Sequence, residues 1–282
     1  MNILVTGANG FLAKELINYF SESELKCNII ATDRRTLDPS NRDNVDDFFN
    51  DIEVDIVIHT AVRGGKRTHK ESIDDLYENL SMFNNLSAHS DKYKMMFNFG
   101  SGAEFDRRYN IFRFAEENVN VVFPQDLYGL AKNLITRKIV DLNSNIFNFR
   151  LFGCFGPLEE DQRLFKATYN KILDNECPVI FQDREMDFFY SQDVGRVIEY
   201  YITNYNTALP KDLNLCYSDK HNISDLVSML KTLTKAPTGV IIETTGLATS
   251  YSGSNSKLNN LNIKLEGLEK GLQTCLKNWN KS

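Results

Sequence analysis

Met1-Asn2-Ile3-Leu4-Val5-Thr6-Gly7-Ala8-Asn9-Gly10-Phe11-Leu12-Ala13 is the stretch of sequence that decides the fold. Its apolar run at 3–5 contains β-branched residues and predicts a buried strand. Gly7 and Gly10 then predict a sharp turn, and the apolar residues beyond Gly10 recur with the period of an amphipathic helix. The spacing Gly-x-x-Gly-x-x-Ala, with Ala13 in third place, is typical of a dinucleotide-binding turn.

A strand, a glycine turn and a helix N-terminus together form an anion site. The unpaired amides of the first helical turn and the helix dipole favour a diphosphate, and glycine lets the phosphate approach the backbone. We therefore expect this turn to bind a dinucleotide through Gly7, Asn9, Gly10, Phe11 and Leu12. The alternative is an ordinary strand-to-helix turn, in which glycines are common.

The composition excludes several classes of function. The chain has 282 residues, 42% of them apolar and 25% charged, and its net charge of −6 offers no basic surface for nucleic acid. We find no apolar run long enough for a membrane helix and no signal-peptide pattern, so no membrane partner is expected. The five cysteines are dispersed without a C-x-x-C pair, which indicates reduced thiols in a cytoplasmic protein.

A second strand is predicted at 27–32, and it ends at Asp33. An acid at this place binds the adenosine ribose and repels a 2′-phosphate, which favours NAD. Arg34 and Arg35 follow, and a guanidinium group suits that phosphate, which favours NADP. Alternatively, the two arginines form a solvated pair. The expected cofactor is therefore NADP or NAD.

Further strands are predicted at 54–59 and 95–99, each separated from the last by a helical stretch. This alternation indicates the α/β class, a Rossmann doubly wound parallel sheet. Ligands of such sheets bind beyond the carboxyl ends of the strands. Ala61, in a run of small residues that can close over the cofactor, and Ser101 are thereby expected at the same edge as the glycine turn.

Tyr128 and Lys132 carry the predicted chemistry. A helical pattern sets them at positions i and i+4 of one helix face. A phenol has a pKa of about 10 and is a weak base at neutral pH, but a cation one turn away and an oxidised nicotinamide lower that pKa. Ser101, at a strand end facing this helix, can orient a substrate hydroxyl or carbonyl toward Tyr128. The trio suits proton transfer coupled to hydride transfer.

Together these motifs resemble those of the extended short-chain dehydrogenase/reductase family, within its branch of nucleotide-sugar epimerases, dehydratases and reductases. The resemblance covers nearly the whole chain. It rests on Thr6-Gly7-x-x-Gly10-Phe11-Leu12, Asp38, Ala61, Asn79, Ser101, Tyr128-x-x-x-Lys132, Arg150-x-x-x-x-x-Gly156-Pro157, the segment 186–193 and the segment 251–258.

The resemblance implies a nucleotide-sugar substrate and a role in nucleotide-sugar or surface polysaccharide biosynthesis. It implies that Asp38, with its neighbour Pro39, contacts the cofactor on its adenine side. Ser101, Tyr128 and Lys132 are then the catalytic residues, and Asn79 supports the site. A homodimer formed through the helices that carry Asn79 and Tyr128 is also implied.

Departures from the family pattern narrow the reaction. In the 4,6-dehydratases of the family an Asp-Glu pair follows the catalytic Ser/Thr, whereas this chain has Gly102 and Ala103, with Glu104 one residue late. If this segment is extended, Glu104 faces away from the site, and dehydration is not expected. The GDP-fucose synthases of the family have a Cys and a His where this chain has Ala103 and Leu158, so 3,5-epimerisation is not expected either.

Two reactions and one non-enzymatic role remain. A reductase of a nucleotide-linked keto-sugar and a nucleotide-sugar C4 epimerase both fit the trio. Phe105-Asp106 resembles the dTDP-4-dehydrorhamnose reductases, and the short chain also favours the reductase. The third hypothesis is an inactive dinucleotide-binding regulatory protein on the same fold.

The chain is expected to divide into a Rossmann domain over 1–153 and a smaller α/β substrate-binding domain over 154–282, some of whose segments return to the sheet. The candidate substrate-binding residues are Arg63, Gly102, Arg163, Arg184 and Tyr190, and of these Arg163, Arg184 and Tyr190 could instead be ordinary surface residues. The basic residues Lys66, Arg67, His69 and Lys70 could steer a diphosphate or form a solvated face. His59 and His221 lack metal-ligand spacing, so no metal is expected.

Overall fold

A central parallel sheet positions the predicted site residues. The structure is a computed structural model that describes residues 1–65, 69–237 and 239–280, so Lys66 and Arg67 of the basic set lie outside the described residues. All six strands of the sheet run parallel. In spatial order they are β10 (Asp212–Leu215), β6 (Ile146–Leu151), β4 (Met95–Ser101), β3 (Ile56–His59), β1 (Asn2–Thr6) and β2 (Asn28–Thr32).

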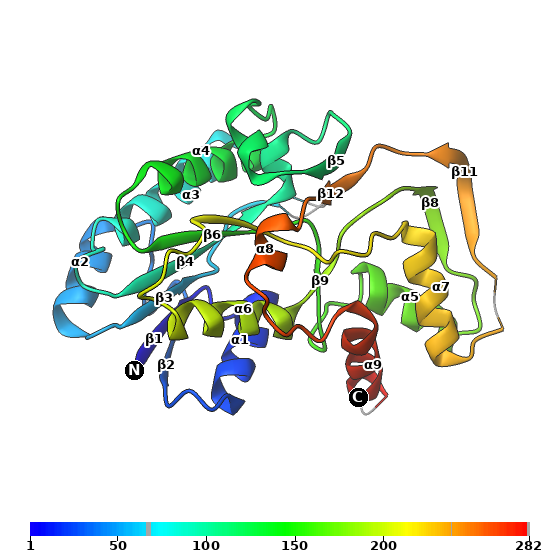
Figure 1. Ribbon diagram of the computed structural model, residues 1–282, viewed down its shortest axis with the longest axis horizontal. Coiled ribbons are helices and arrows are strands. Elements are labelled where there is room, and N and C mark those ends of the chain that lie inside the picture. The colour runs from blue at the N-terminus through cyan, green and yellow to red at the C-terminus, as the bar shows by residue number, and fades with distance from the viewer. Residues whose placement is uncertain (66–68, 238, 281–282) are drawn as a thin grey trace.

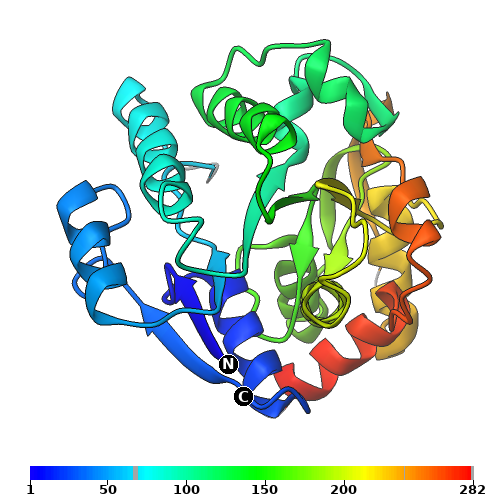
Figure 2. The ribbon, with the colours of Figure 1, turned by 60° about the vertical axis from the view of Figure 1, so that its left-hand side comes forward.

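Helices cover both faces of this sheet, as Figures 1 and 2 show. One face carries α2 (Arg42–Asp51), α3 (Ile73–Ser87) and α4 (Leu127–Asp141), and the other carries α1 (Phe11–Glu22) and α6 (Ser191–Thr203). The arrangement confirms the predicted Rossmann fold. The helix predicted around Tyr128 and Lys132 is α4, which begins one residue before Tyr128.

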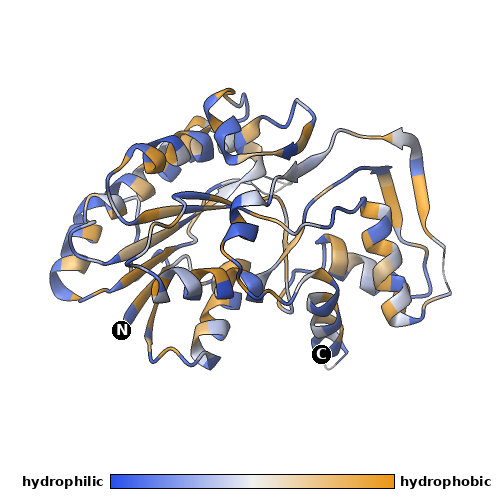
Figure 3. Cartoon of the chain, in the orientation of Figure 1, coloured by the Kyte–Doolittle hydropathy of each residue, from blue (hydrophilic) through white to orange (hydrophobic). Residues whose placement is uncertain are grey.

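The central strands are buried on both faces, which explains why β1 and β3 are largely apolar. Successive side chains of a strand point to opposite faces. Ile3 and Val5 therefore join the cluster against α1 and α6, whereas Leu4 joins the cluster against α2, α3 and α4. Figure 3 shows the resulting concentration of hydrophobic colour on the central strands.

The strand order reverses between β1 and β3. The chain adds β2 on one side of β1 and then crosses to β3 on the other. Doubly wound sheets bind ligands at such a reversal, beyond the carboxyl ends of the strands. Thr6 and His59, the last residues of β1 and β3, are paired in register. The glycine turn and Ala61 follow them directly.

Residues beyond β6 build a second lobe. Its elements are β7 (Cys154–Phe155), α5 (Leu164–Leu173), β8 (Val179–Asp183), β9 (Phe189–Tyr190), α7 (Ile223–Thr234), β11 (Ile241–Leu247) and α9 (Leu268–Trp279), toward the right of Figure 1. Within the same part of the sequence, α6 and β10 belong to the layers of the central sheet. Among the described residues we find no helix both long and apolar enough to cross a membrane.

Short elements connect the sheet edge to the C-terminal part of the chain. They are η1 (Gly102–Phe105), β5 (Ile111–Phe114), η2 (Glu116–Asn120), β12 (Tyr251–Gly253) and α8 (Ser256–Asn260). β12 pairs in parallel with β5. The C-terminal segment 251–253 therefore lies beside the segment that follows Ser101.

Candidate active site

The glycine turn is shaped to receive an anion. Gly7 has a φ of +70°, and a Cβ on it would lie 2.8 Å from the Cα of Ala61, so only glycine fits without strain. Gly10 is the N-cap of α1, and this helix has neither a side-chain cap nor an acid in its first turn. Its first amides, from Phe11 onward, therefore remain available to a diphosphate. The turn fits the dinucleotide expected from the sequence.

Asp33 lies at the ribose end of the turn and is held there by two neighbours. Its carboxylate accepts a 2.6 Å hydrogen bond from Arg35 and a 3.3 Å bond from Asn9 Nδ2. The hydrogen bonds from Arg35 hold the pKa of Asp33 at about 2. Asp33 is thus ionised at neutral pH, and its ion-pair partner Arg35 has a side chain that is 89% exposed, so the two residues form a solvent-exposed pair.

Arg34 turns away from Asp33 toward the acids beyond it. Its guanidinium contacts the carboxylates of Asp38 at 2.9 Å and Glu78 at 3.3 Å. Asp38 also accepts hydrogen bonds from both the backbone N–H and the hydroxyl of Ser40. The carbonyl of Pro39 accepts a bond from an amide on α3. The segment predicted to contact the adenine is therefore tied to α3.

Ser101, Tyr128 and Lys132 meet at the carboxyl edge of the sheet. Ser101 is the last residue of β4, and α4 begins beside it with Asp126 as its N-cap. The buried Lys132 donates a 2.8 Å hydrogen bond from Nζ to the carbonyl of Phe99, also on β4. Burial lowers the pKa of Lys132 to about 8. This amine is cationic at neutral pH and close to losing its proton.

Tyr128 is a protonated phenol in this environment. Burial is the largest influence and raises the pKa of Tyr128, while a hydrogen bond with Ser101 and the charge of Arg107 lower it. Lys132 Nζ lies 6.0 Å from the centre of the Tyr128 ring. A phenol that keeps its proton at neutral pH suits the role of proton donor.

His59 is a core residue at the end of β3. Its Nδ1 lies 2.8 Å from the hydroxyl of Thr6, and the side chain is buried. Burial and the charge of Lys132 lower the pKa of His59 to about 3, so its ring is neutral. We find no group of metal-ligating side chains among the residues that the structure describes.

Glu104 points away from the site, but its segment is not extended. The segment is the 3-10 helix η1, and Glu104 reaches back to accept a 2.8 Å hydrogen bond from the backbone N–H of Ser101. Its other oxygen accepts bonds from Thr136 and from Arg150, at 2.9 Å and 2.7 Å. Arg150, which is fully buried, also pairs with Asp212 at 2.7 Å. Every oxygen of Glu104 thus has a partner within the protein.

Asn79 holds the loop after β3. Its side chain accepts a 3.0 Å hydrogen bond from the backbone N–H of Arg63 and donates one of 3.0 Å to the carbonyl of the same residue. The Arg63 guanidinium lies 2.9 Å from Glu78. Arg63 therefore sits at the cofactor edge beside Arg34, which shares Glu78.

The other substrate candidates lie in different surroundings. Gly102 adjoins Ser101 and is buried. Arg163 donates a 2.6 Å hydrogen bond to the carbonyl of Cys154 and lies 4.9 Å from the centre of the Phe11 ring, on the side of the glycine turn. Arg184 follows β8 in the second lobe, with its guanidinium 3.8 Å from the sulfur of Met186.

Tyr190 is not at the surface. It is 1% exposed and packs in the core of the second lobe against Phe155, with ring centres 5.4 Å apart. The sequence marked it as polar and near a family motif, but its ring fills space between β9 and α9. The expectation that Tyr190 binds substrate was wrong, because its role is packing.

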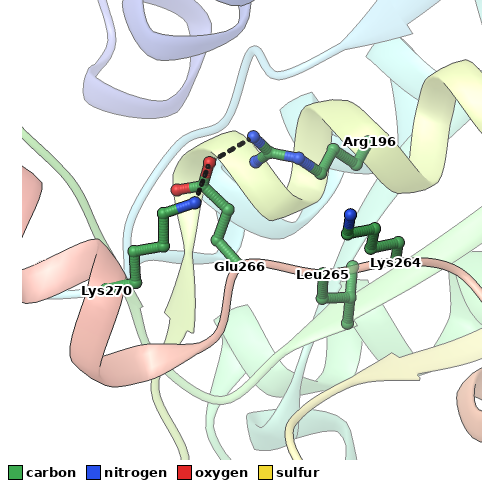
Figure 4. Close-up of a pocket in the computed structure, with 5 residues that line it drawn as sticks. All are labelled: Arg196, Lys264, Leu265, Glu266 and Lys270. Carbon is green, nitrogen blue, oxygen red and sulfur yellow. Dashed lines mark hydrogen bonds and ion pairs between the residues drawn. The ribbon is translucent and has the colours of Figure 1, made fainter.

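A surface hollow elsewhere contains none of the predicted site residues. It has a volume of about 350 Å³ and is lined by Arg196, Lys264, Leu265, Glu266 and Lys270. Glu266 binds Arg196 at 2.7 Å and Lys270 at 3.3 Å, as the dashed lines of Figure 4 show. These pairs hold the segment before α9 against α6.

Two residues near the trio were missed by sequence reasoning. Tyr251 Oη lies 3.4 Å from Ser101 Oγ. Arg107 contacts Asp126 at 2.6 Å, and its charge lowers the pKa of Tyr128 and of Tyr251. Residue 251 opens a family-like segment, but the sequence alone does not show that this segment pairs with β5.

The comparisons with known proteins agree with this geometry. A sequence model of the NAD dependent epimerase/dehydratase family matches residues 3–216. No curated protein matches the sequence significantly. Similar solved structures include GDP-mannoheptose C4 reductase from Campylobacter jejuni with NADP bound (20% identity, TM-score 0.83, covering 99% of this chain and 98% of that chain). The same fold is found in a dTDP-4-dehydrorhamnose reductase from Clostridium acetobutylicum (21% identity, TM-score 0.82, covering 99% of this chain and 100% of that chain). It is also found in UDP-glucose 4-epimerase from Thermotoga maritima (17% identity, TM-score 0.81, covering 100% of this chain and 99% of that chain).

Proposed function

The chain belongs to the NAD dependent epimerase/dehydratase family, and from that premise we propose that it is an NAD(P)-dependent reductase of a nucleotide-linked keto-sugar. The observation that carries the proposal is the meeting of Ser101, Tyr128 and Lys132 at one sheet edge, while Glu104 is bound to Arg150. Elimination of water needs a further acid or base beside the trio. With Glu104 occupied, the trio is suited to hydride transfer alone.

In the proposed reaction the substrate carbonyl oxygen lies between the Ser101 hydroxyl and the Tyr128 phenol. A bound reduced nicotinamide supplies the hydride that the carbonyl carbon receives. Ser101 donates a hydrogen bond to the oxygen, and Tyr128 transfers its proton to it, so the ketone becomes an alcohol. The cationic Lys132 stabilises the phenolate that remains on Tyr128.

A C4 epimerase is the alternative, since it uses the same trio to oxidise and re-reduce one carbon. Two observations support the reductase. Phe105-Asp106 follows the trio serine, as in the dTDP-4-dehydrorhamnose reductases that the sequence resembles. Burial also keeps Tyr128 protonated, which is the state that reduction requires at its start.

The charge of Lys132 predicts the pH dependence of the reaction. Since burial lowers the pKa of Lys132 to about 8, the amine is charged below that pH and neutral above it. The rate of reduction should be level near pH 7 and fall about tenfold per unit above pH 8, because the phenolate then lacks its cation. Steady-state kcat/KM measured from pH 6 to 10 checks this. A Lys132→Met variant should have a low kcat/KM that does not fall further above pH 8. A wild-type kcat/KM that rises through pH 8 would contradict the role given to the Lys132 charge.

A substrate screen tests the proposed function. Thermal shift with dTDP-, GDP- and UDP-linked sugars, with NADPH or NADH present, identifies the nucleotide and the cofactor. Turnover is then followed by loss of reduced-nicotinamide absorbance with the corresponding 4-keto-sugars. Oxidation of the cofactor by at least one keto-sugar is expected. Dinucleotide binding without turnover of any of them would favour the inactive regulatory protein.

The assembly and location of the chain are further proposals. Homodimerisation through α3 and α4 is supported by their packing side by side on one face and by the exposed Ile73 and Tyr77 on α3. Light scattering after gel filtration tests it. A cytoplasmic location is supported by the five cysteines, all of them free thiols.

A further inference from the structure

Tyr251 is a second phenol at the reacting end of the site, brought there by the C-terminal strand. β12 is anchored on both sides of this residue: the Tyr251 N–H donates to the carbonyl of Glu185 at 2.9 Å, and its carbonyl accepts from Asp187 at 3.2 Å. The ring packs edge-on against Phe152, with ring centres 5.4 Å apart. The phenol is therefore fixed in position rather than loosely placed.

Gly102 is the residue that lets this phenol approach. A Cβ on Gly102 would lie 2.8 Å from Cζ of Tyr251 and 2.4 Å from Cδ1 of Phe152. Neither ring could keep its place beside a larger residue at 102. Glycine at position 102 thus leaves the space that Tyr251 needs to reach Ser101.

The hydrogen bonds that Ser101 Oγ accepts determine to which acceptor its hydroxyl can donate. A hydroxyl has two acceptor sites and one proton. The backbone N–H of Ala103 donates to Ser101 Oγ at 3.2 Å, and Tyr251 Oη lies 3.4 Å away. If Tyr251 also donates, both acceptor sites are filled and the one serine proton is left for Tyr128, the third hydrogen-bond partner of Ser101, or for a substrate oxygen that enters between the two. The long distance between the oxygens is of the kind that shortens when substrate enters a site.

We propose that Tyr251 is a positioning residue that donates to Ser101 and so compels the Ser101 hydroxyl to donate to the substrate carbonyl oxygen. Burial raises the pKa of Tyr251, so its phenol keeps the proton that this role requires. The inference rests on the proposed function, since it concerns the carbonyl that Ser101 and Tyr128 are proposed to hold. It adds a residue that acts through Ser101 and not on the substrate itself.

A double-mutant cycle tests the inference. The variants are Tyr251→Phe, Ser101→Ala and the double variant, assayed with the 4-keto-sugar that the wild type reduces fastest. Loss of one neutral hydrogen bond should lower kcat about three- to tenfold in Tyr251→Phe, with KM for the sugar within about twofold. Ser101→Ala should lose on the order of a hundredfold. The double variant should match Ser101→Ala, because Tyr251 then has no serine to direct.

Controls separate positioning from simple packing. Tyr251→Phe keeps the ring, so its unfolding temperature and reduced-cofactor affinity should equal those of the wild type. The matched control Tyr205→Phe removes the same oxygen from a tyrosine that is 55% exposed and should change nothing. An unchanged kcat in Tyr251→Phe overturns the inference. It is also overturned if Tyr251→Phe lowers kcat by the same factor in the wild type and in the Ser101→Ala variant. The proposed function fails separately, if the wild type oxidises no cofactor with any keto-sugar.

Discussion

Tyr128→Phe is expected to lose turnover by on the order of a thousandfold, while its affinity for the dinucleotide stays within about twofold of the wild type. The substitution removes the only proton that the phenol can give to the substrate oxygen. It leaves the glycine turn, Asp33 and the Lys132–Phe99 hydrogen bond as they are. Turnover should therefore be lost while cofactor affinity is kept.

The measurement pairs steady-state kinetics with titration of reduced-nicotinamide fluorescence. Tyr205→Phe serves again as the control, since it removes an equivalent oxygen from the surface. A Tyr128→Phe variant that keeps more than a tenth of the wild-type kcat would remove Tyr128 from the mechanism. A loss of cofactor affinity of tenfold or more would assign the residue to binding.

Arg150→Met is expected to lower the free energy of unfolding by about 3–5 kcal/mol. Arg150 is completely buried and pairs with Glu104 and Asp212, both at 2.7 Å. Removal of the guanidinium leaves two carboxylates in the core without a cation, and each must be neutralised or desolvated at a high cost. Because Glu104 also holds the N–H of Ser101, activity should fall with stability.

Urea unfolding of the wild type and the variant measures this difference. The triple variant Arg150→Met, Glu104→Gln, Asp212→Asn is the control, since it removes the cation and both charges together. It should recover much of the lost stability, because the loss is attributed to unpaired charge and not to the missing side chain. A loss below about 1 kcal/mol in Arg150→Met would show that the buried ion pairs contribute little.

The sheet and the meeting of Ser101, Tyr128 and Lys132 at its edge could be predicted from sequence because their signals are local. An apolar run such as 3–5, a glycine with no room for a Cβ at Gly7, and a tyrosine and lysine one helical turn apart are all properties of neighbouring residues. The strand order then brings these local features to one edge.

The features that sequence reasoning missed depend on contacts between distant segments. Glu104 was expected to face away from the site if its segment were extended, but the segment is η1, in which Glu104 accepts a hydrogen bond from Ser101 and pairs with Arg150. Tyr190 was expected to bind substrate or else to be an ordinary surface residue, and the packing of β9 on α9 buries it. Tyr251 reaches Ser101 across 150 residues of sequence. Hydrophobic periodicity contains no information on such pairings.

Counting reduced cofactor against product is the most direct test of the proposed reaction. The purified chain is mixed with a limiting amount of the nucleotide-linked keto-sugar and an excess of NADPH or NADH, and both the absorbance change and the sugar product are quantified. A reductase consumes one reduced cofactor for each alcohol formed, and this ratio is the predicted result. Interconversion of two nucleotide-sugar epimers without any net change in absorbance would contradict it and assign the trio to C4 epimerisation.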